Sequence, residues 1–296
     1  MANLRDIRKR IEASLDIKKI TTTMEKIASV RTLKSRKRLG FSREYSNAIK
    51  QYSSDLFKTA LHEEKDLGDI PMINSKKDTK SICLVVISAN QGMCGGFNTS
   101  INKLAEEVYK KHKREKRSVI IYSIGKKVYK YFNNNNIPVT VAPLLYSDNT
   151  LMMDVCPFSR LLIDGFCGQR MDEIYLIYTK YFSTTTRIPV VEELLPCRKY
   201  LEKLDAPNTK LSLCSPNIKE LLELLIPELI SNRIFQGILE STVCENISRR
   251  MAMQQASTSA KDMIDELRSV YNTVRKNKIT RELNEIMGTV IALGRH

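Results

Sequence analysis

The sequence predicts an α/β fold in which an antiparallel coiled coil of long N- and C-terminal helices accompanies a central Rossmann-like α/β domain. All nine prolines lie between Pro71 and Pro227, so both ends of the chain lack the residue that most strongly breaks helices. Apolar residues at each end recur every three or four positions, whereas the middle alternates short apolar runs with helical patterns. We expect an N-terminal coiled-coil helix over 1–67, an α/β domain over 78–198 and a C-terminal coiled-coil helix over 215–296.

The N-terminal segment carries a narrow apolar stripe. It has two runs in which apolar residues recur every three or four positions: Leu4, Ile7 and Ile11, then Ile17, Ile20, Met24 and Ile27. A stripe of this width is too narrow to cover a globular core, but it fits against one partner helix. As a helix, residues 2–60 would extend about 85–90 Å at about 1.5 Å per residue, which is longer than a single globular core.

The C-terminal segment carries a second stripe, in which small side chains recur. The stripe consists of Ile230, Ile234, Gly237, Ser241, Cys244, Ser248 and Met251, followed by Ile264, Leu267, Tyr271 and Val274. Alanines also repeat every four residues at Ala252, Ala256 and Ala260, and small residues let two helix axes approach closely. Both segments flank a compact middle from which they protrude, so we expect them to pair antiparallel as a coiled coil.

The start of the second long helix is also predicted by its residue types. Ser215 can cap a helix, and Pro216 then takes the first helical position, where its missing N–H costs nothing. Pro227 removes a helical hydrogen bond further on. We therefore expect a short helix over 216–226, a kink, and a long helix from Glu228 onward.

The middle of the chain alternates buried strands with helices. Strands are expected at 81–88, at 118–124, in the run "IPVTVAP", at 173–182 and at 188–195. Helical spacing appears between them in "NTSINKLAEEVYKKHKRE", "KKVYKYF" and "FSRLLIDGF". Strands that alternate with helices indicate a largely parallel sheet with right-handed crossovers.

A glycine-rich turn follows the first expected strand. Its residues Gly92, Gly95 and Gly96 give the spacing G-x-x-G-G, which matches neither the dinucleotide-binding fingerprint nor the P-loop. We interpret the three glycines as a structural turn that permits positive φ and close packing of strand and helix. The alternative is a nucleotide-dependent α/β enzyme with helical dimerisation arms, although the sequence contains no recognisable catalytic motif. We expect no cofactor and no metal, because the seven cysteines form no C-x-x-C pair and the three histidines have no ligand spacing.

The positive charge of the chain is concentrated at its N-terminus. The net charge is +15, and residues 1–50 hold 14 Lys and Arg against 5 Asp and Glu. Such a basic segment suits nucleic acid, anionic lipid or an acidic protein surface. A basic coiled-coil adaptor for nucleic acid is thus a third hypothesis, but residues 1–40 contain no aromatic side chain for base stacking, so we expect no nucleic acid. The apolar runs are also far shorter than the roughly 20 residues of a membrane span.

Five stretches of this sequence, in order along the whole chain, resemble the gamma subunit of F-type ATP synthases. They are "MANLRDIRKRI", "KKITTTMEKIASV", "SANQGMCGGFN", "PVVEELLP" and "ENISRRMAMQQASTSAKDMIDELRSVYNTVRKNKITRELNEIMG". The resemblance implies a non-catalytic rotor of the central stalk, whose paired terminal helices thread a ring of alternating alpha and beta subunits. It also implies that the α/β domain lies on the ring of c subunits, with the epsilon (or delta) stalk subunit beside it.

The resemblance further implies which residues contact the ring of alpha and beta subunits. They are Met24, Arg31, Lys34, Arg36, Lys37, Arg38, Arg275, Lys276, Thr280 and Glu282. Met24 matches the methionine that faces an acidic loop of the beta subunits, and the basic cluster suits the same surroundings. The expected location is the surface of an energy-coupling membrane, reached only through the complex: the bacterial inner membrane on its cytoplasmic face, or the mitochondrial inner membrane on its matrix face.

Overall fold

The chain folds into two compact units. One unit combines residues 1–29 with 249–296, and the other comprises residues 30–248. The structure is a computed structural model, and it describes residues 4–62, 67, 70–74, 79–144, 146–203 and 217–293, with only the backbone for 290–293. The predicted cap at Ser215 and Pro216 lies outside these residues.

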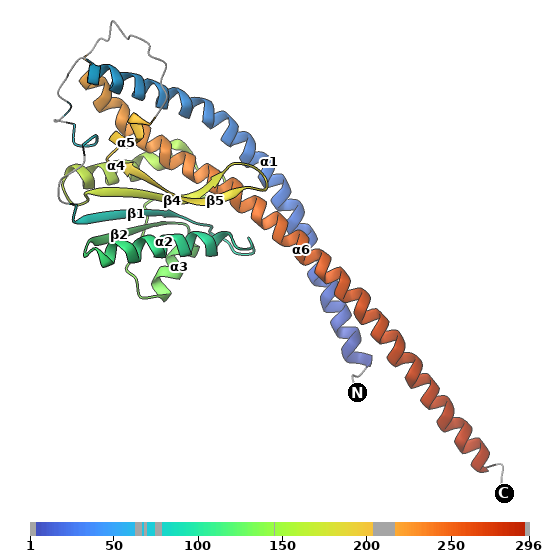
Figure 1. The fold of residues 1–296 in the computed structure, drawn as a ribbon. Helices are drawn as coiled ribbons and strands as arrows, with labels where there is room; N and C mark the ends of the chain where they lie inside the picture. The colour runs from blue at the N-terminus through green and yellow to red at the C-terminus, as the bar shows by residue number, and fades with distance from the viewer. Residues whose placement is uncertain are drawn as a thin grey trace. The chain divides into compact units, whose positions relative to one another are not determined.

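Long helices lie at the two ends of the chain, and a sheet with shorter helices lies between them in sequence (Figure 1). The helices are α1 (Leu4–His62), α2 (Phe97–Arg114), α3 (Lys126–Asn134), α4 (Met152–Cys167), α5 (Arg198–Glu202) and α6 (Ile218–Leu293). The strands are β1 (Ser81–Ile87), β2 (Ser118–Ile124), β3 (Thr140–Val141), β4 (Glu173–Tyr181) and β5 (Arg187–Leu195). The mixed α/β class with long terminal helices is therefore confirmed.

The two long helices run antiparallel, as the fold prediction stated. In the first unit, the Ser14 hydroxyl donates to Met263 Sδ over 3.6 Å, and Thr22 Oγ1 lies 3.0 Å from Ser257 Oγ. Gln236 of the second unit donates to the backbone oxygen of Ser42 over 2.8 Å. Residue numbers on α6 therefore fall as residue numbers on α1 rise, which shows that the two helices pair antiparallel.

The buried face of α1 differs from the predicted apolar stripe. Ile17, Ile20 and Ile27 are 53%, 60% and 44% exposed, so assigning them to the seam was wrong. The positions that are buried in the first unit instead recur every seven residues, at Ile7, Ser14, Thr21 and Ala28. A heptad repeat keeps one face of a helix against its partner. Three of these four side chains are small and two are polar, so a search for large apolar residues alone could not find the seam.

The same repeat continues along α1 within the second unit. The buried positions there include Thr32, Ser35, Leu39, Ser46, Ser53 and Ala60. Leu39 packs into a small apolar cluster with Leu239, Val243 and Ile247 of α6. The buried face of α1 in this unit thus combines small side chains with larger apolar ones, since Ile49, Leu56 and Phe57 are buried as well.

Helix α6 departs from the prediction at Pro227 and at Met251. It is assigned as one helix from Ile218 to Leu293, so the expected break at Pro227 is wrong. The buried neighbours Ile226 and Ile230 pack into the main core there, and tertiary packing can outweigh the helix propensity of one residue. Met251, which was assigned to the C-terminal stripe, is 46% exposed, so this assignment was wrong. Met253, two residues further on, is buried instead.

The sheet has the strand order β3-β2-β1-β4-β5. β1 pairs in parallel with β2 and with β4, and β2 pairs in parallel with β3, as alternating strands and helices predict. β5 instead pairs antiparallel with β4. The connection between β4 and β5 is too short for a crossover helix, so the chain can only turn back as a hairpin.

Two apolar layers cover the faces of this sheet, and they follow the alternation of side chains along β1. Ile82, Leu84 and Val86 face a cluster that contains residues of α2 and α3. Cys83, Val85 and Ile87 face the larger cluster, with residues of α4 and α6. Figure 1 shows α2 and α3 together on one side of the sheet. This sandwich positions the loops at the carboxyl ends of β1 and β2 beside α1 and α6.

Replacing Gly40 by alanine is expected to stabilise the chain by about 0.5–1 kcal/mol. Gly40 lies inside α1, and a Cβ atom added there would meet no atom within 4 Å. Gly237→Ala is the matched control, because its Cβ would lie 3.0 Å from Leu176 Cδ2 and lose part of the same gain. Urea denaturation measures both changes, and a destabilising Gly40→Ala would contradict the exposed helical position.

Candidate functional site

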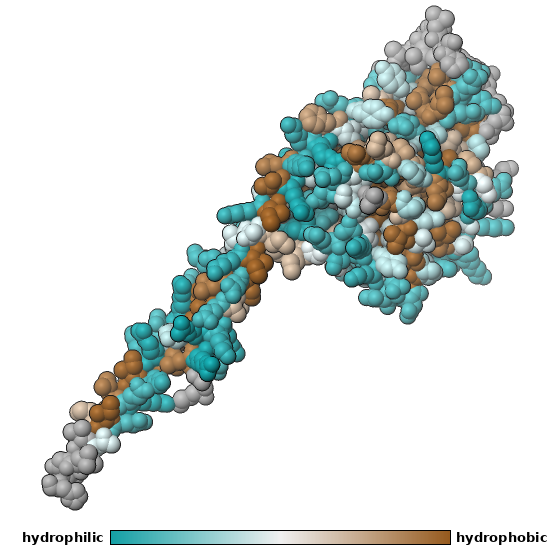
Figure 2. All heavy atoms as spheres, turned by 180° about the vertical axis from the view of Figure 1, so that it is seen from behind, coloured by the Kyte–Doolittle hydropathy of each residue, from teal (hydrophilic) through white to brown (hydrophobic). Residues whose placement is uncertain are grey.

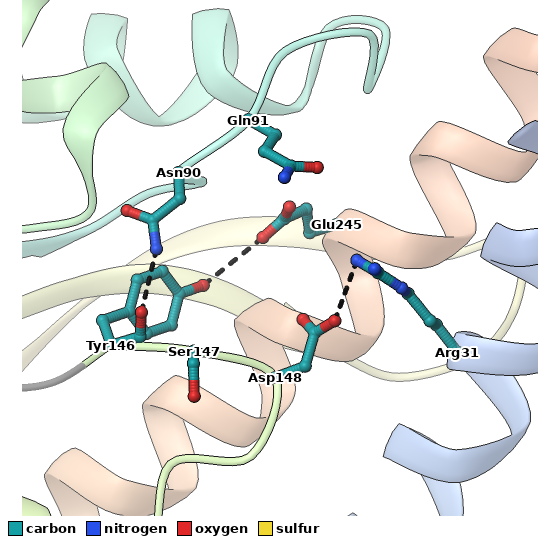
Figure 3. Close-up of a pocket in the computed structure, with 7 residues that line it drawn as sticks. All are labelled: Arg31, Asn90, Gln91, Tyr146, Ser147, Asp148 and Glu245. Atoms are coloured by element: carbon teal, nitrogen blue, oxygen red, sulfur yellow. Dashed lines mark hydrogen bonds and ion pairs between the residues drawn. The ribbon is translucent and has the colours of Figure 1, made fainter.

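Three of the predicted basic residues of α1 bind a loop of the same unit, which runs over 146–151 between β3 and α4. Arg31 Nη1 lies 3.0 Å from Asp148 Oδ2, and Figure 3 shows the two side chains pointing toward each other. Lys34 Nζ donates to Asn149 Oδ1 over 3.3 Å. Arg38 donates to the backbone oxygens of Asp148 and Thr150. The cluster therefore holds this loop against α1.

The contacts between α1 and this loop differ in how much they stabilise it. The Arg31–Asp148 ion pair contributes little, and the hydrogen bonds from Arg38 to the loop backbone contribute more. Arg31 and Asp148 are 46% and 40% exposed at their side chains, and exposed ion pairs contribute about 0–1 kcal/mol. Arg38 is less exposed and reaches two carbonyl groups, so it fixes the loop in one position. Arg31 and Lys34 remain accessible to a partner at their outer sides.

Arg36 and Lys37 lie on the exposed side of α1, away from the loop. The Arg36 guanidinium lies 5.9 Å from the centre of the Tyr181 ring, and Lys37 Nζ lies 5.8 Å from that of Phe41. Contacts at this distance are weak cation–π contacts. Phe41 is 66% exposed, so the pair forms a surface with an aromatic and a basic part.

The loop, the glycine-rich turn and α6 meet around a small cavity of about 210 Å³. Figure 3 shows Asn90 and Gln91 entering it from the turn, Tyr146 from the loop and Glu245 from α6. Asn90 Nδ2 donates to the backbone oxygen of Tyr146 over 2.9 Å, and the Tyr146 hydroxyl donates to Glu245 Oε2 over 3.3 Å. Burial and then the nearby Glu245 charge raise the pKa of Tyr146, so it stays a neutral donor.

Hydrogen bonds hold the glycine-rich turn together and also join it to the loops beside it. Asn98 Oδ1 accepts from the Ala89 N–H over 3.1 Å, and its amide group donates to Cys94 Sγ over 3.0 Å. The side-chain Oδ1 of Asn90 accepts the backbone N–H of Lys126 over 3.1 Å. The polar side chains that could hold a phosphate are thus used to join the turn to the next loop.

The three predicted turn glycines differ from one another. Gly95 has φ +56°, a conformation that favours glycine. The other residue of this turn with a positive φ is Met93, which is not a glycine. Gly92 and Gly96 are not among the residues with positive φ, and a Cβ on Gly96 would meet open space. The turn therefore needs glycine at one of the three positions.

The predicted contact residues near the end of α6 belong to the other unit and are all exposed. Arg275, Lys276, Thr280 and Glu282 lie in a stretch, residues 275–289, in which every described residue is exposed. Glu282 pairs with Lys278 over 3.5 Å, one turn away on the same helix. Met24 lies in this unit too, on α1, where it is partly buried.

The exposed end of α6 also carries apolar residues that the sequence reasoning did not single out. Ile279, Leu283 and Ile286 are 48%, 56% and 59% exposed and lie four and three residues apart, on one face of the helix. Met287 is 60% exposed beside them. Figure 2 shows hydrophobic surface on this end of the unit, next to the grey terminal atoms. The spacing of these three residues can be read from the sequence, but the sequence does not show that this face is left exposed.

Over residues 3–293 the chain matches the protein family described as "ATP synthase". A relative from Buchnera aphidicola, named "ATP synthase gamma chain", is 30% identical over 296 residues and covers 99% of each chain. The chain belongs to the ATP synthase gamma-chain family. Another gamma chain, from Glaesserella parasuis, is 28% identical and covers 99% of this chain and all of its own length.

Solved ATP synthase structures share the fold of this gamma chain. The central stalk and c-ring structure from the mitochondrial ATP synthase of Tetrahymena thermophila contains a chain with a TM-score of 0.61 and 20% identity, covering 80% of this chain and 99% of its own. A chain of the Euglena gracilis mitochondrial enzyme has a TM-score of 0.55 and 18% identity, covering 88% and 94%.

Gamma chains are the non-catalytic central-stalk subunits of the rotary F-type enzyme, whose catalytic sites lie on the beta subunits. In this gamma chain, Asn90 of the glycine-rich turn binds the loop after β3 and the start of α3, which follows β2. Among the described residues, no helix is both long and apolar enough to pass through a bilayer.

Proposed function

We propose that this gamma chain is the shaft that carries rotation from a membrane ring of c subunits to the catalytic sites on beta. The observation that carries the proposal is the end of α6, where exposed apolar and charged residues continue the helix beyond its buried seam. The last buried seam residue described on α6 is Ile264, at 3% exposure. A face such as Ile279, Leu283 and Ile286 fits the inner surface of another protein.

The backbone of both long helices supports a mechanical role. α1 has 59 residues and α6 has 76, each assigned without a break. Bending or unwinding such a helix requires hydrogen bonds along its axis to be lost, whereas a loop deforms without that cost. The proposed shaft therefore transmits torque instead of absorbing it as a local change of shape.

The proposed partners follow from chemistry as well as from family. The exposed end of α6 with Arg275, Lys276, Thr280 and Glu282, and Met24 on α1, would meet the alpha and beta subunits. The basic residues Arg31, Lys34, Arg36, Lys37 and Arg38 would face acidic loops of beta with the sides that the 146–151 loop leaves accessible. The α/β domain would bind the c ring and the epsilon (or delta) stalk subunit. In the complex, the chain would lie peripherally on an energy-coupling membrane, bacterial or mitochondrial.

Leu283→Asp is expected to weaken assembly with the alpha and beta subunits and to lower the ATP hydrolysis of the reconstituted complex at least several-fold. The change places a charge where the apolar face would be buried, and an unpaired buried charge is strongly unfavourable. Asn284→Asp is the matched control, since it introduces the same side chain one residue away, on another face of the same exposed helix.

The measurement is ATP hydrolysis of alpha and beta subunits mixed with each full-length variant, together with co-elution of the three chains. The isolated chain should hydrolyse no ATP. Equal losses for Leu283→Asp and Asn284→Asp would show that charge alone, and not the apolar face, causes the effect. Hydrolysis by alpha and beta that is indifferent to the wild-type chain would reject the shaft.

A further inference from the structure

A second cavity, of about 310 Å³, lies in the unit of residues 30–248 between the helices and the sheet. Its walls come from α1, β4, β5, α5 and α6. Among the lining residues, Arg43 and Asn47 are exposed, whereas Arg233 is 6% exposed. The cavity thus extends from solvent to a buried guanidinium group. It shares no lining residue with the cavity of Figure 3.

The guanidinium of Arg233 is incompletely paired. Its Nη2 lies 3.6 Å from Glu192 Oε2, and its Cζ lies 3.9 Å from the centre of the Tyr200 ring. Nε and Nη1 are buried and have no hydrogen-bond partner. The buried Ser46 hydroxyl, which also lines the cavity, has none either. Buried polar groups nearly always find a partner, so these donors indicate a missing acceptor.

The nearest carboxylates are already occupied by other donors. Glu192 Oε1 accepts from Lys180 Nζ and from the Tyr178 hydroxyl, each over 3.0 Å. Glu240 accepts the backbone N–H of Tyr181 over 3.0 Å and pairs with Arg43 over 3.6 Å. Neither carboxylate reaches the two unpartnered nitrogens of Arg233, Nε and Nη1.

Positive charge exceeds negative charge around the cavity. The lining holds four cationic side chains, Arg43, Lys50, Lys180 and Arg233, against the two carboxylates Glu192 and Glu240. Burial lowers the pKa of Lys50, partly offset by the two carboxylates, and Lys50 has no ion pair with a described residue. Burial disfavours ionised Glu192, but Lys180 and Arg233 outweigh this and lower its pKa. Burial raises the pKa of Glu240, which weakens the negative side further.

We infer that this cavity binds one small phosphate-type oxyanion, with Arg233 and Ser46 donating hydrogen bonds and Lys50 supplying charge. A tetrahedral dianion offers several acceptor oxygens to a planar guanidinium and balances two excess positive charges. The volume exceeds that of one such ion, and water would fill the remainder, since each water takes about 30 Å³ of liquid volume. A bound anion would join α1, the sheet and α6 within this unit.

The test is equilibrium dialysis of the full 296-residue chain with radiolabelled inorganic phosphate, at ionic strength held constant with KCl. We expect one saturable site. Arg233→Met should weaken it about tenfold or more, because it removes charge-assisted hydrogen bonds, and Lys50→Met should weaken it less. Lys103→Met is the control, because Lys103 is an exposed lysine of α2 outside the cavity lining. It removes one positive charge and should leave binding unchanged.

Competition distinguishes the source of the phosphate group. Displacement of label by AMP at lower concentration than by unlabelled phosphate would identify a nucleotide phosphate, and the reverse order would identify the free ion; both support the site. Displacement by acetate at equal concentration would overturn the phosphate-type assignment. Absence of saturable binding to the folded chain would mean that the cavity holds water only and would overturn the proposal.

Folding of each variant is checked by circular dichroism before dialysis. Should Arg233→Met fail to fold, phosphate binding is measured with Lys50→Met and Arg233→Lys instead. Arg233→Lys keeps the positive charge but loses the planar guanidinium group. Wild-type affinity in both would overturn the assignment. The measurement needs no alpha or beta subunit, so its failure would leave the proposed shaft untouched, and failure of the shaft would leave the anion site untouched.

Discussion

Replacing Ile264 by proline is expected to abolish ion-driven ATP synthesis by the assembled complex. Ile264 is a buried seam residue of α6. Proline would remove one hydrogen bond inside the helix and its ring would clash with the preceding turn, at a cost of about 3 kcal/mol or more. A kinked α6 would no longer turn as one body, so rotation at one end would be lost before it reached the other.

The measurement compares ATP synthesis and ATP hydrolysis in membrane vesicles that contain the variant complex. Ile264→Ala is the control: it removes the packed side chain, at a cost of about 2–5 kcal/mol, but leaves the helix hydrogen bonds intact. The proline variant should therefore lose more synthesis than the alanine variant, in complexes of equal subunit content. Wild-type synthesis with Ile264→Pro would contradict a torque-bearing helix.

Gly125→Ala is expected to destabilise the unit of residues 30–248 by about 3 kcal/mol or more. Gly125 follows β2 with φ +103°, and an added Cβ would lie 2.2 Å from the backbone oxygen of Ser88. The backbone cannot relieve this clash cheaply, because the Ser88 N–H donates to Ile124 and its hydroxyl accepts from Val128. The substitution would push apart the loops that follow β1 and β2.

The control for this prediction is Gly96→Ala, in the neighbouring glycine-rich turn. Gly96 has φ −77°, and its added Cβ would meet nothing within 4 Å. Alanine there should change stability by no more than about 1 kcal/mol, with a small gain expected from the stiffer unfolded chain. Denaturant unfolding of both variants gives the comparison. Similar losses at the two positions would show that the turn glycines, and not Gly125, set the geometry.

The sheet and the helical ends could be predicted from sequence because their signals are local. Apolar runs such as "ICLVVI" are buried on both faces of a parallel sheet, and long stretches without proline stay helical. The hairpin of β4 and β5 and the unbroken passage through Pro227 depend on packing partners from elsewhere in the chain. Local patterns contain no information on such partners.

The candidate site shows the same limit. The basic residues of α1 were evident in the sequence, but Asp148, which pairs with Arg31, is 117 positions away and belongs to no periodic pattern. Arg233 likewise lies in a stretch of α6 with no motif around it, and only the fold brings Glu192 and Tyr200 to it. The heptad seam was missed for a different reason, because its serines and threonines do not register as hydrophobic.

The small side chains of that seam also determine how the helix pair responds to temperature. Ser14, Thr21 and Ala28 bury little hydrocarbon, so their separation hydrates little new apolar surface. The heat capacity of unfolding rises with exposed apolar area and falls with exposed polar area. The first unit should therefore have a flatter stability curve than a leucine-lined pair of the same length, and its cohesion should vary little between cold and warm surroundings.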